Sequence, residues 1–181
     1  MAKESLSEEM EFPEGVNASL DGVTLIVSGV KGEVNRTFRN PRVILKIDGR
    51  KIILSTVGNT RRDKTILKTY IAHIENAFHG VKEGYVYKLK ICSGHFPMTV
   101  SMSNNILEIK NFLGEKIPRK VKLKSGAKVK VEGDRITVEG QDKERTGQVA
   151  ADIEQATRRP GFDRRIFQDG IYITDKAGEL I

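Results

Sequence analysis

The sequence predicts an α+β fold made of two tandem duplicated domains, each a small antiparallel sheet packed with one helix. Two observations lead to this prediction. Strand-like segments separated by tight-turn signals are followed by one helical segment, and this order occurs twice along the chain. In addition, three segments of the first half match three of the second half in the same order.

The first half begins with two predicted hairpins and ends with a helix. Asp-Gly dipeptides favour tight turns, and they divide residues 16–27 and residues 42–55 into strand pairs. Residues 60–78 follow as a helix, because apolar side chains recur there at three- and four-residue spacing. Gly80 stands where a left-handed helix cap is expected.

The second half repeats this programme at offsets of 79–84 residues. In the longest match, three of ten positions are identical and five more keep their size or charge. Each match is weak alone, but their common order indicates a duplication. The matched segments are residues 23–27 with 106–110, 45–54 with 129–138, and 72–77 with 151–156.

The duplication places a domain boundary between residues 82 and 83. Residues 1–82 are the predicted N-terminal repeat, and residues 83–181 are the C-terminal repeat with a basic loop and tail. Residues 1–14 carry five glutamates and one lysine, and we expect this acidic lead to be frayed.

The net charge of the chain and its lack of long apolar runs indicate which kind of protein it is and which kind of partner it binds. The chain has 181 residues, with 31 Lys and Arg against 24 Asp and Glu, giving a net charge of +7. This excess favours a polyanionic partner, either nucleic acid or an anionic surface. No apolar run approaches the ~20 residues that span a membrane, and residues 1–20 lack a signal core. We therefore expect a soluble intracellular protein without a membrane partner.

The sequence offers no metal or catalytic motif. Cys92 is the only cysteine, which excludes an intrachain disulfide and a cysteine-based zinc site. Cys92 and His95 have a metal-like spacing but no assured further ligands, so we expect no metal. No phosphate-binding loop is complete, and Asp169 has no evident titratable partner. We expect no catalytic residue, cofactor or small-molecule substrate.

Basic charge is concentrated in residues 110–130, where eight basic side chains meet only Glu115. Alternation along predicted strands sends five of these lysines to one face. If the strands pair through residues 125–127, the lysines crowd across a hairpin, which a polyanion would relieve. The alternative is a solvated lysine face that protects a sheet edge. The five are Lys120, Lys122, Lys124, Lys128 and Lys130.

A second basic cluster follows the second helix. Its arginines suit phosphate groups because a guanidinium donates two hydrogen bonds in parallel. Phe162 offers a stacking face for an unpaired base. We expect Phe167 to anchor the tail in the core instead, since Ile171 and Ile173 continue an alternating apolar pattern. The arginines are Arg158, Arg159, Arg164 and Arg165.

Two segments resemble the large-subunit ribosomal protein six family in its archaeal or eukaryotic form. Residues 165–173 read Arg-Ile-Phe-Gln-Asp-Gly-Ile-Tyr-Ile and precede Lys176, which is similar to the family's C-terminal signature. Residues 80–85 resemble the stretch between the family's two domains. Phe162 departs from the family pattern, which usually has a basic residue there.

The resemblance implies a structural constituent of the large ribosomal subunit in the cytoplasm, and not an enzyme. It implies binding to large-subunit rRNA near the stalk base, the sarcin–ricin loop and the subunit interface, beside neighbouring ribosomal proteins. The alternative is a basic adaptor domain that binds an acidic protein. The expected RNA-binding residues are Lys120, Lys122, Lys124, Lys128, Lys130, Arg158, Arg159, Arg164, Arg165 and Lys176.

We further expect the two repeats to divide their labour. The second repeat would be the main RNA-binding half, because its basic residues are clustered. The first repeat would serve as a spacer and neighbour-binding module. Its expected secondary RNA contacts are Arg61, Arg62 and Lys64.

Overall fold

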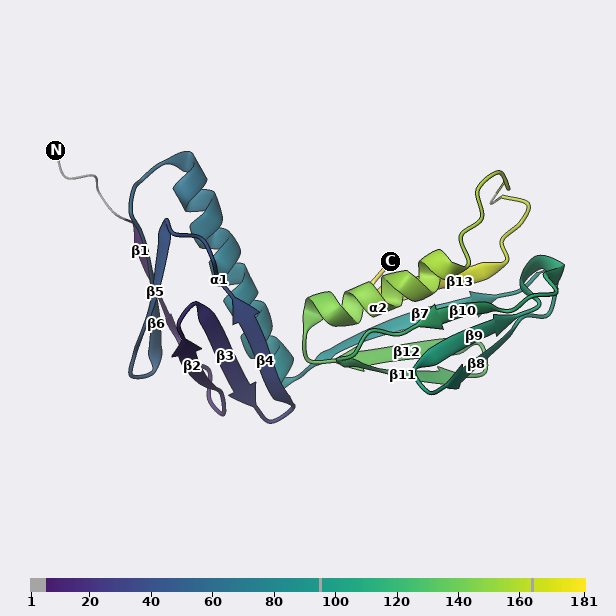
Figure 1. Ribbon diagram of the computed structural model, residues 1–181, viewed down its shortest axis with the longest axis horizontal. Coiled ribbons are helices and arrows are strands. Elements are labelled where there is room, and N and C mark those ends of the chain that lie inside the picture. The colour runs from purple at the N-terminus through teal and green to yellow at the C-terminus, as the bar shows by residue number, and fades with distance from the viewer. Residues whose placement is uncertain (1–5, 95, 164) are drawn as a thin grey trace. The chain divides into compact units, whose positions relative to one another are not determined.

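The computed structural model describes residues 6–94, 96–163 and 165–181. These form two compact units that divide after Gly84 (Figure 1). The expected boundary lay two residues earlier. The helix of the first unit continues through Gly80 to Lys82, and Gly84 takes the left-handed backbone (φ +79°) that was expected at Gly80.

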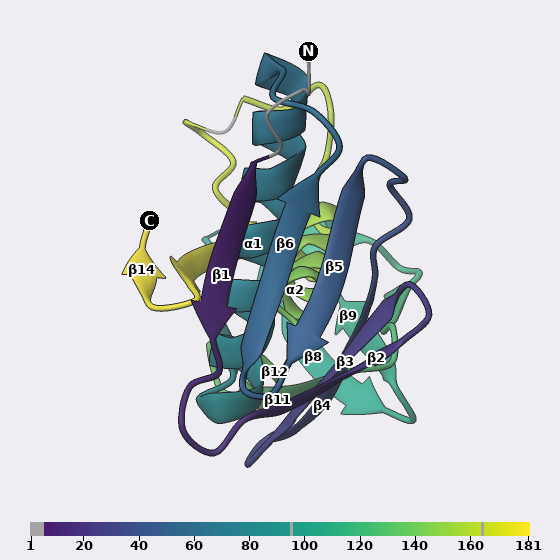
Figure 2. The same ribbon diagram turned by 90° about the vertical axis from the view of Figure 1, so that its left-hand side faces the viewer.

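The first unit contains two three-stranded antiparallel sheets, in the orders β1-β6-β5 and β2-β3-β4, and one helix. Figure 2 shows β1, β6 and β5 side by side with α1 behind them. Leu67, Ile74 and Phe78 bury the apolar stripe of α1 in the core that the two sheets share. The elements are β1 (Ser7–Glu11), β2 (Asn17–Asp21), β3 (Thr24–Gly29), β4 (Gly32–Thr37), β5 (Val43–Asp48), β6 (Lys51–Thr56) and α1 (Arg61–Lys82).

The second unit contains a three-stranded sheet, β10-β9-β8, and a five-stranded sheet, β11-β12-β7-β13-β14. Val149 and Ile153 of α2 are buried in its core with Leu89 and Ile171. The elements are β7 (Tyr85–Cys92), β8 (Thr99–Ser103), β9 (Ile106–Lys110), the 3₁₀ helix η1 (Phe112–Gly114), β10 (Arg119–Lys122), β11 (Ala127–Glu132), β12 (Arg135–Gly140), α2 (Lys143–Ala156), β13 (Gly170–Lys176) and β14 (Glu179–Leu180).

The two units repeat one topology, which confirms the tandem α+β fold. Six strands precede the helix in each unit, and β7-β12-β11 corresponds to β1-β6-β5 as β8-β9-β10 does to β2-β3-β4. Each helix therefore covers two sheets where the sequence predicted one. The second unit alone continues, adding β13 and β14 beyond its helix.

The expectation that residues 1–14 are frayed is wrong for residues 7–11. These form β1, which pairs antiparallel with β6 from Ser7 opposite Ser55 to Glu11 opposite Lys51. Met10 and Phe12 are partly buried against the core. Glu9 and Glu11 lie within 3.5 and 3.4 Å of the Lys51 ammonium. Three of the five residues of β1 are glutamates, so the apolar contacts of Met10 and Phe12 were not enough to predict a strand here.

The conditional hairpin of residues 120–124 with 128–131 is also wrong. β10 pairs with β9, whereas β11 pairs with β12 in the other sheet. Residues 123–126 therefore connect two sheets instead of turning back on one. The crowding of lysines across one hairpin does not occur, because each lysine strand faces a neighbour that carries carboxylates.

Gly29 allows the β3–β4 turn to approach the end of α1. A Cβ at this position would lie 2.8 Å from the Val81 carbonyl oxygen, which accepts a 2.9 Å hydrogen bond from the Lys31 N–H. We predict that Gly29→Ala lowers the free energy of unfolding by about 1–3 kcal/mol, since backbone must shift to admit the methyl group. Val30→Ala in the same turn, where Val30 is 84% exposed, should change it by no more than ~0.5 kcal/mol. Urea unfolding measures both, and equal effects would refute the close approach.

The buried carboxylate of Asp63 lies in the first turn of α1 and forms a capping box with Thr60. The Thr60 backbone N–H and hydroxyl donate to Asp63 Oδ2 at 3.2 and 2.6 Å, and the Arg42 guanidinium lies 3.1 Å from Oδ1. The Thr60 hydroxyl bond, with help from Arg42, holds the pKa of Asp63 below its usual value of 3.8. A carboxyl group whose pKa is lower in the folded than in the unfolded state stabilises the protein at pH values above its unfolded pKa. This stabilisation is lost as the pH falls through its folded pKa.

We therefore predict that wild type is more stable than Asp63→Asn at pH 7 and that the difference shrinks below pH ~4. Urea unfolding at several pH values measures it. A difference independent of pH would show that charge on Asp63 does not contribute.

Candidate nucleic-acid interface

The lysines of β10 and β11 project outward from two different sheets. Lys120, Lys122, Lys124, Lys128 and Lys130 are all exposed, and the apolar residues between them are partly or fully buried. The alternation along each strand is thus as expected. What differs is the arrangement, since three of these lysines belong to β10 and its following loop and two to β11.

Three of these lysines already have a carboxylate partner. The ammonium groups of Lys120, Lys124 and Lys130 lie 3.6, 3.2 and 3.6 Å from carboxylate oxygens. Such exposed pairs are worth roughly 0–1 kcal/mol, so a phosphate could replace the carboxylate at little cost. Lys122 and Lys128 have no ion pair in the part of the chain that the structure describes. The partners are Glu108, Asp152 and Glu139, respectively.

The basic loop lies between the end of α2 and the start of β13. Arg158 and Arg159 are exposed and follow Thr157, the C-cap of α2. Arg165 is 90% exposed and donates to Asp163 at 2.8 Å, and this hydrogen bond lowers the pKa of the Asp163 carboxyl. Arg164 lies outside the described residues. The loop thus presents three described guanidiniums. Arg165 is paired within the loop, and Arg159 lies 3.8 Å from Glu115 Oε1 outside it.

Aromatic rings accompany these arginines. The Arg159 guanidinium lies over the Phe162 ring, 4.4 Å from its centroid, and Phe162 meets Phe167 edge-on at 5.1 Å. Phe162 is 39% exposed and Phe167 is half-buried. The expectation that Phe167 anchors the tail in the core is wrong, because the buried core holds Ile171 and not Phe167.

Buried polar groups anchor the tail instead. The Asp169 carboxylate accepts hydrogen bonds from the backbone N–H groups of Gly94 (2.7 Å) and Phe96 (3.3 Å). The Thr157 hydroxyl accepts from the Ile171 N–H at 2.9 Å and donates to the Glu154 carbonyl at 3.1 Å. These bonds fix both ends of the basic loop. Asp169, expected only as a turn residue, connects β13 to the segment after β7.

The Arg119 side chain makes contacts within the fold and adds little to the charged surface. Its guanidinium makes two hydrogen bonds to the Glu115 carboxylate (2.8 and 2.6 Å) and one to the Ala156 carbonyl at the end of α2 (2.7 Å). It also lies 4.4 Å from the centroid of the buried Phe112 ring. The bonds from Arg119 lower the pKa of Glu115. The four-residue spacing of Glu115 and Arg119 indicates pairing only in a helix, and residues 115–118 are not helical, so periodicity could not predict this contact.

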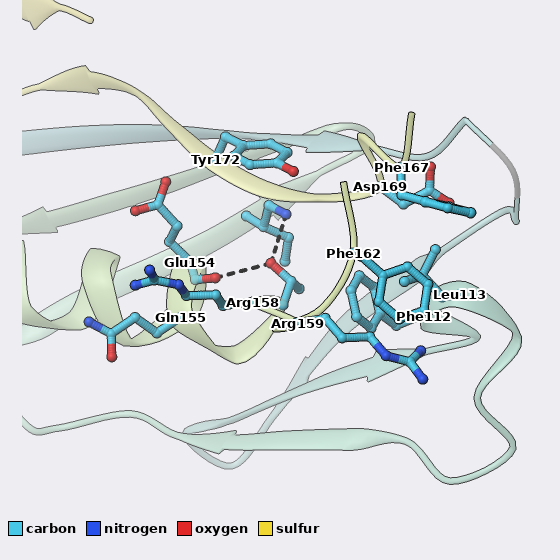
Figure 3. A pocket seen from close by; sticks show the side chains of 12 residues that line it. Phe112, Leu113, Glu154, Gln155, Arg158, Arg159, Phe162, Phe167, Asp169 and Tyr172 are labelled. Carbon is cyan, nitrogen blue, oxygen red and sulfur yellow. Dashed lines mark hydrogen bonds between the residues drawn. The ribbon is translucent and has the colours of Figure 1, made fainter. Parts of the chain in front are cut away.

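A cavity of about 260 Å³ opens between the end of α2, the basic loop, η1 and β13 (Figure 3). Arg158 and Arg159 extend to opposite sides of it. Phe112 and Phe162 line the side of Arg159, and Glu154 lines the other. The Thr157 hydroxyl and its two hydrogen bonds form part of the wall.

The remaining predicted residues lie elsewhere. Lys176 is exposed at the far end of β13 from the basic loop, one residue beyond Asp175, which pairs with Lys88 at 3.1 Å. Arg61, Arg62 and Lys64 are exposed in the first turn of α1, in the other unit. Positive charge at a helix N-terminus opposes the helix dipole, so these side chains are not there to stabilise α1.

Other kinds of site find no support in the described residues. No three His, Cys, Asp or Glu side chains among residues 6–94, 96–163 and 165–181 come together as a metal site, and His95 falls outside these ranges. No helix in the described part of the chain is long and apolar enough to cross a membrane.

Comparison with known proteins relates both units of the chain to one protein family. The sequence model of the family described as ribosomal protein L6 matches residues 12–84 and 96–170, one segment in each unit. The chain is 46% identical over 172 residues to large ribosomal subunit protein uL6 of Sulfurisphaera tokodaii, covering 94% of this chain and 92% of that one. It is 44% identical over 178 residues to the uL6 of Desulfurococcus amylolyticus and 41% over 176 to that of Methanococcus vannielii, with 97% of each chain covered.

The contacts of Arg119 predict its effect on stability. Arg119→Gln should lower the free energy of unfolding by about 2 kcal/mol, because charge-assisted hydrogen bonds to Glu115 and Ala156 are lost. Lys120→Gln removes the same charge from the next residue and should cost no more than ~1 kcal/mol. Urea unfolding compares the two. Indistinguishable midpoints would mean that Arg119 does not hold η1 to α2.

Proposed function

The chain belongs to the ribosomal protein L6 family, and from that premise we propose that it is a structural constituent of the large subunit of the cytoplasmic ribosome that binds large-subunit rRNA. The relatives are named as proteins of the large ribosomal subunit. The proposed position is near the stalk base, the sarcin–ricin loop and the subunit interface, beside neighbouring ribosomal proteins. The role is to stabilise rRNA structure and not to catalyse a reaction.

The observation that supports rRNA binding most directly is the basic loop after α2. It places exposed guanidiniums beside an exposed aromatic ring, the combination that binds phosphates and unpaired bases. Backbone hydrogen bonds to Thr157 and Asp169 hold both ends of the loop. A pre-ordered loop loses little conformational entropy on binding.

The second unit is proposed as the main RNA-binding half. β10 and β11 do not form a hairpin with each other, so the support comes from the arginine loop and from the separate lysine faces of these two strands. These comprise Lys120, Lys122, Lys124, Lys128 and Lys130, with Arg158, Arg159, Arg165 and Lys176, and Arg164 by sequence alone. The first unit would add secondary contacts through Arg61, Arg62 and Lys64.

Salt dependence tests whether the partner is RNA phosphate. Each phosphate contact releases counterions, so log affinity should fall with log salt by about 0.7–0.9 per contact. We predict a steep fall for wild type on deproteinised large-subunit rRNA, measured by filter binding. An affinity that barely changes over a several-fold salt range would contradict phosphate contacts and favour the adaptor alternative.

Two matched triple variants test the division of labour. Replacing Arg158, Arg159 and Arg165 by Gln should reduce the salt slope by about two to three, since each phosphate contact contributes roughly one. Replacing Arg61, Arg62 and Lys64 by Gln removes the same charge from the other unit and should reduce it less. An equal or larger loss in the first-unit variant would contradict the proposal.

A further inference from the structure

The cavity at the basic loop combines a cationic rim with an interior that repels anions. Arg158 and Arg159 extend to its opposite sides (Figure 3). The carboxylates of Glu154 and Asp169 belong to its lining. A phosphate would be drawn to the rim but repelled from the interior, so the part of an RNA that enters the cavity should be a base and not a phosphate.

The lining also favours a flat group. Phe162 is 39% exposed, and the guanidinium of Arg159 lies over one face of its ring, 4.4 Å from the centroid, so an aromatic ring and a guanidinium plane both border the cavity. Aromatic rings and arginine planes are the surfaces on which unpaired bases stack. At about 260 Å³ the cavity is below the ~300–1,000 Å³ typical of drug-sized ligands, which suits a single planar ring system.

We propose that this cavity receives one unstacked nucleobase of the bound RNA, with the phosphates on either side of that nucleotide held by Arg158 and Arg159. The inference rests on the proposed rRNA binding and names what this loop would recognise. RNA proteins commonly read bases that leave the helix at loops and bulges, where stacking and edge contacts are both available.

Glu154 gives the cavity an acceptor for the edge of a base. Its Oε1 accepts a hydrogen bond from the Ile173 N–H at 3.1 Å, and a carboxylate has about four acceptor sites. Adenine, cytosine and guanine carry an exocyclic amino group that donates to a carboxylate, and uracil carries the N3–H. The Glu154 carboxylate can therefore accept a hydrogen bond from the edge of any unpaired base that enters the cavity.

Chemical footprinting of full-length protein on deproteinised large-subunit rRNA tests this inference. Hydroxyl radicals report backbone contact, and base-specific reagents report the exposure of each unpaired base. With wild type we expect a backbone footprint and, within it, one unpaired base whose reactivity falls about tenfold.

Two variants act on the cavity without changing net charge. Gln155→Trp places a large ring at an exposed lining position, and Phe162→Ala removes the stacking wall. Both should restore the reactivity of that base while keeping the backbone footprint, and should lower affinity about tenfold, within the range for loss of one base–aromatic stack. Phe96→Ala is the matched control, because Phe96 is 45% exposed in the same unit but does not line the cavity.

The outcomes separate this inference from the proposed function. A backbone footprint without any base whose protection depends on Gln155 and Phe162 would overturn the base site and leave rRNA binding intact. The same holds if Phe96→Ala exposes the base as much as Phe162→Ala does. Absence of any footprint would overturn both proposals.

Discussion

β7 is paired on both of its edges, with β12 on one side and β13 on the other, and this double pairing organises the second unit. β13 returns from beyond α2 to lie antiparallel to β7, from Gly170 opposite Cys92 to Lys176 opposite Tyr87. Because α2 and β13 are both fixed on the sheet, the basic loop between them is held at its two ends. The Thr157 hydroxyl completes this arrangement by bonding the backbone of β13. The arginines of this loop therefore lie between two anchored ends.

The first unit shows what the same topology does without a returning strand. Among the described residues, β1, the counterpart of β7, pairs only with β6 and so forms an edge of its sheet. Its side chains are mainly glutamates, of which Glu8 lies 3.8 Å from the Lys68 ammonium and Glu9 and Glu11 contact Lys51. Charges along an edge strand discourage pairing with another chain. The corresponding strand edge is thus protected from pairing with another chain in two ways. In the second unit β13 covers it, and in the first unit charged side chains line it.

Sequence patterns predicted the tandem fold because hydrophobic periodicity and turn chemistry are local, and a duplication tests them twice. Pairing partners are not local. Residues 120–124 were expected to pair with the next strand along the chain, but β10 completes a sheet with β9. Likewise, counting charge treated Arg119 as part of a basic run, although Glu115, Ala156 and Phe112 surround it in the fold. Which cations remain available to a partner depends on tertiary neighbours, which periodicity does not contain.

The placement of carboxylates changes the reason for expecting a polyanion. Lysines opposed across one hairpin would need an outside anion to relieve their repulsion. Instead Lys120 lies opposite Glu108, and Lys128 opposite Glu139, which also lies 3.6 Å from Lys130. In the free protein these lysine strands therefore face carboxylates and not one another. In the proposed RNA complex, exchanging a carboxylate for a phosphate would change stability little, because exposed ion pairs contribute so little, and counterion release would drive association. Binding of this kind is strong in sum but unspecific at each lysine. In the proposed complex, selectivity would come from the arginine loop, where an anchored backbone, an aromatic ring and a carboxylate-lined cavity offer contacts that a line of phosphates does not make.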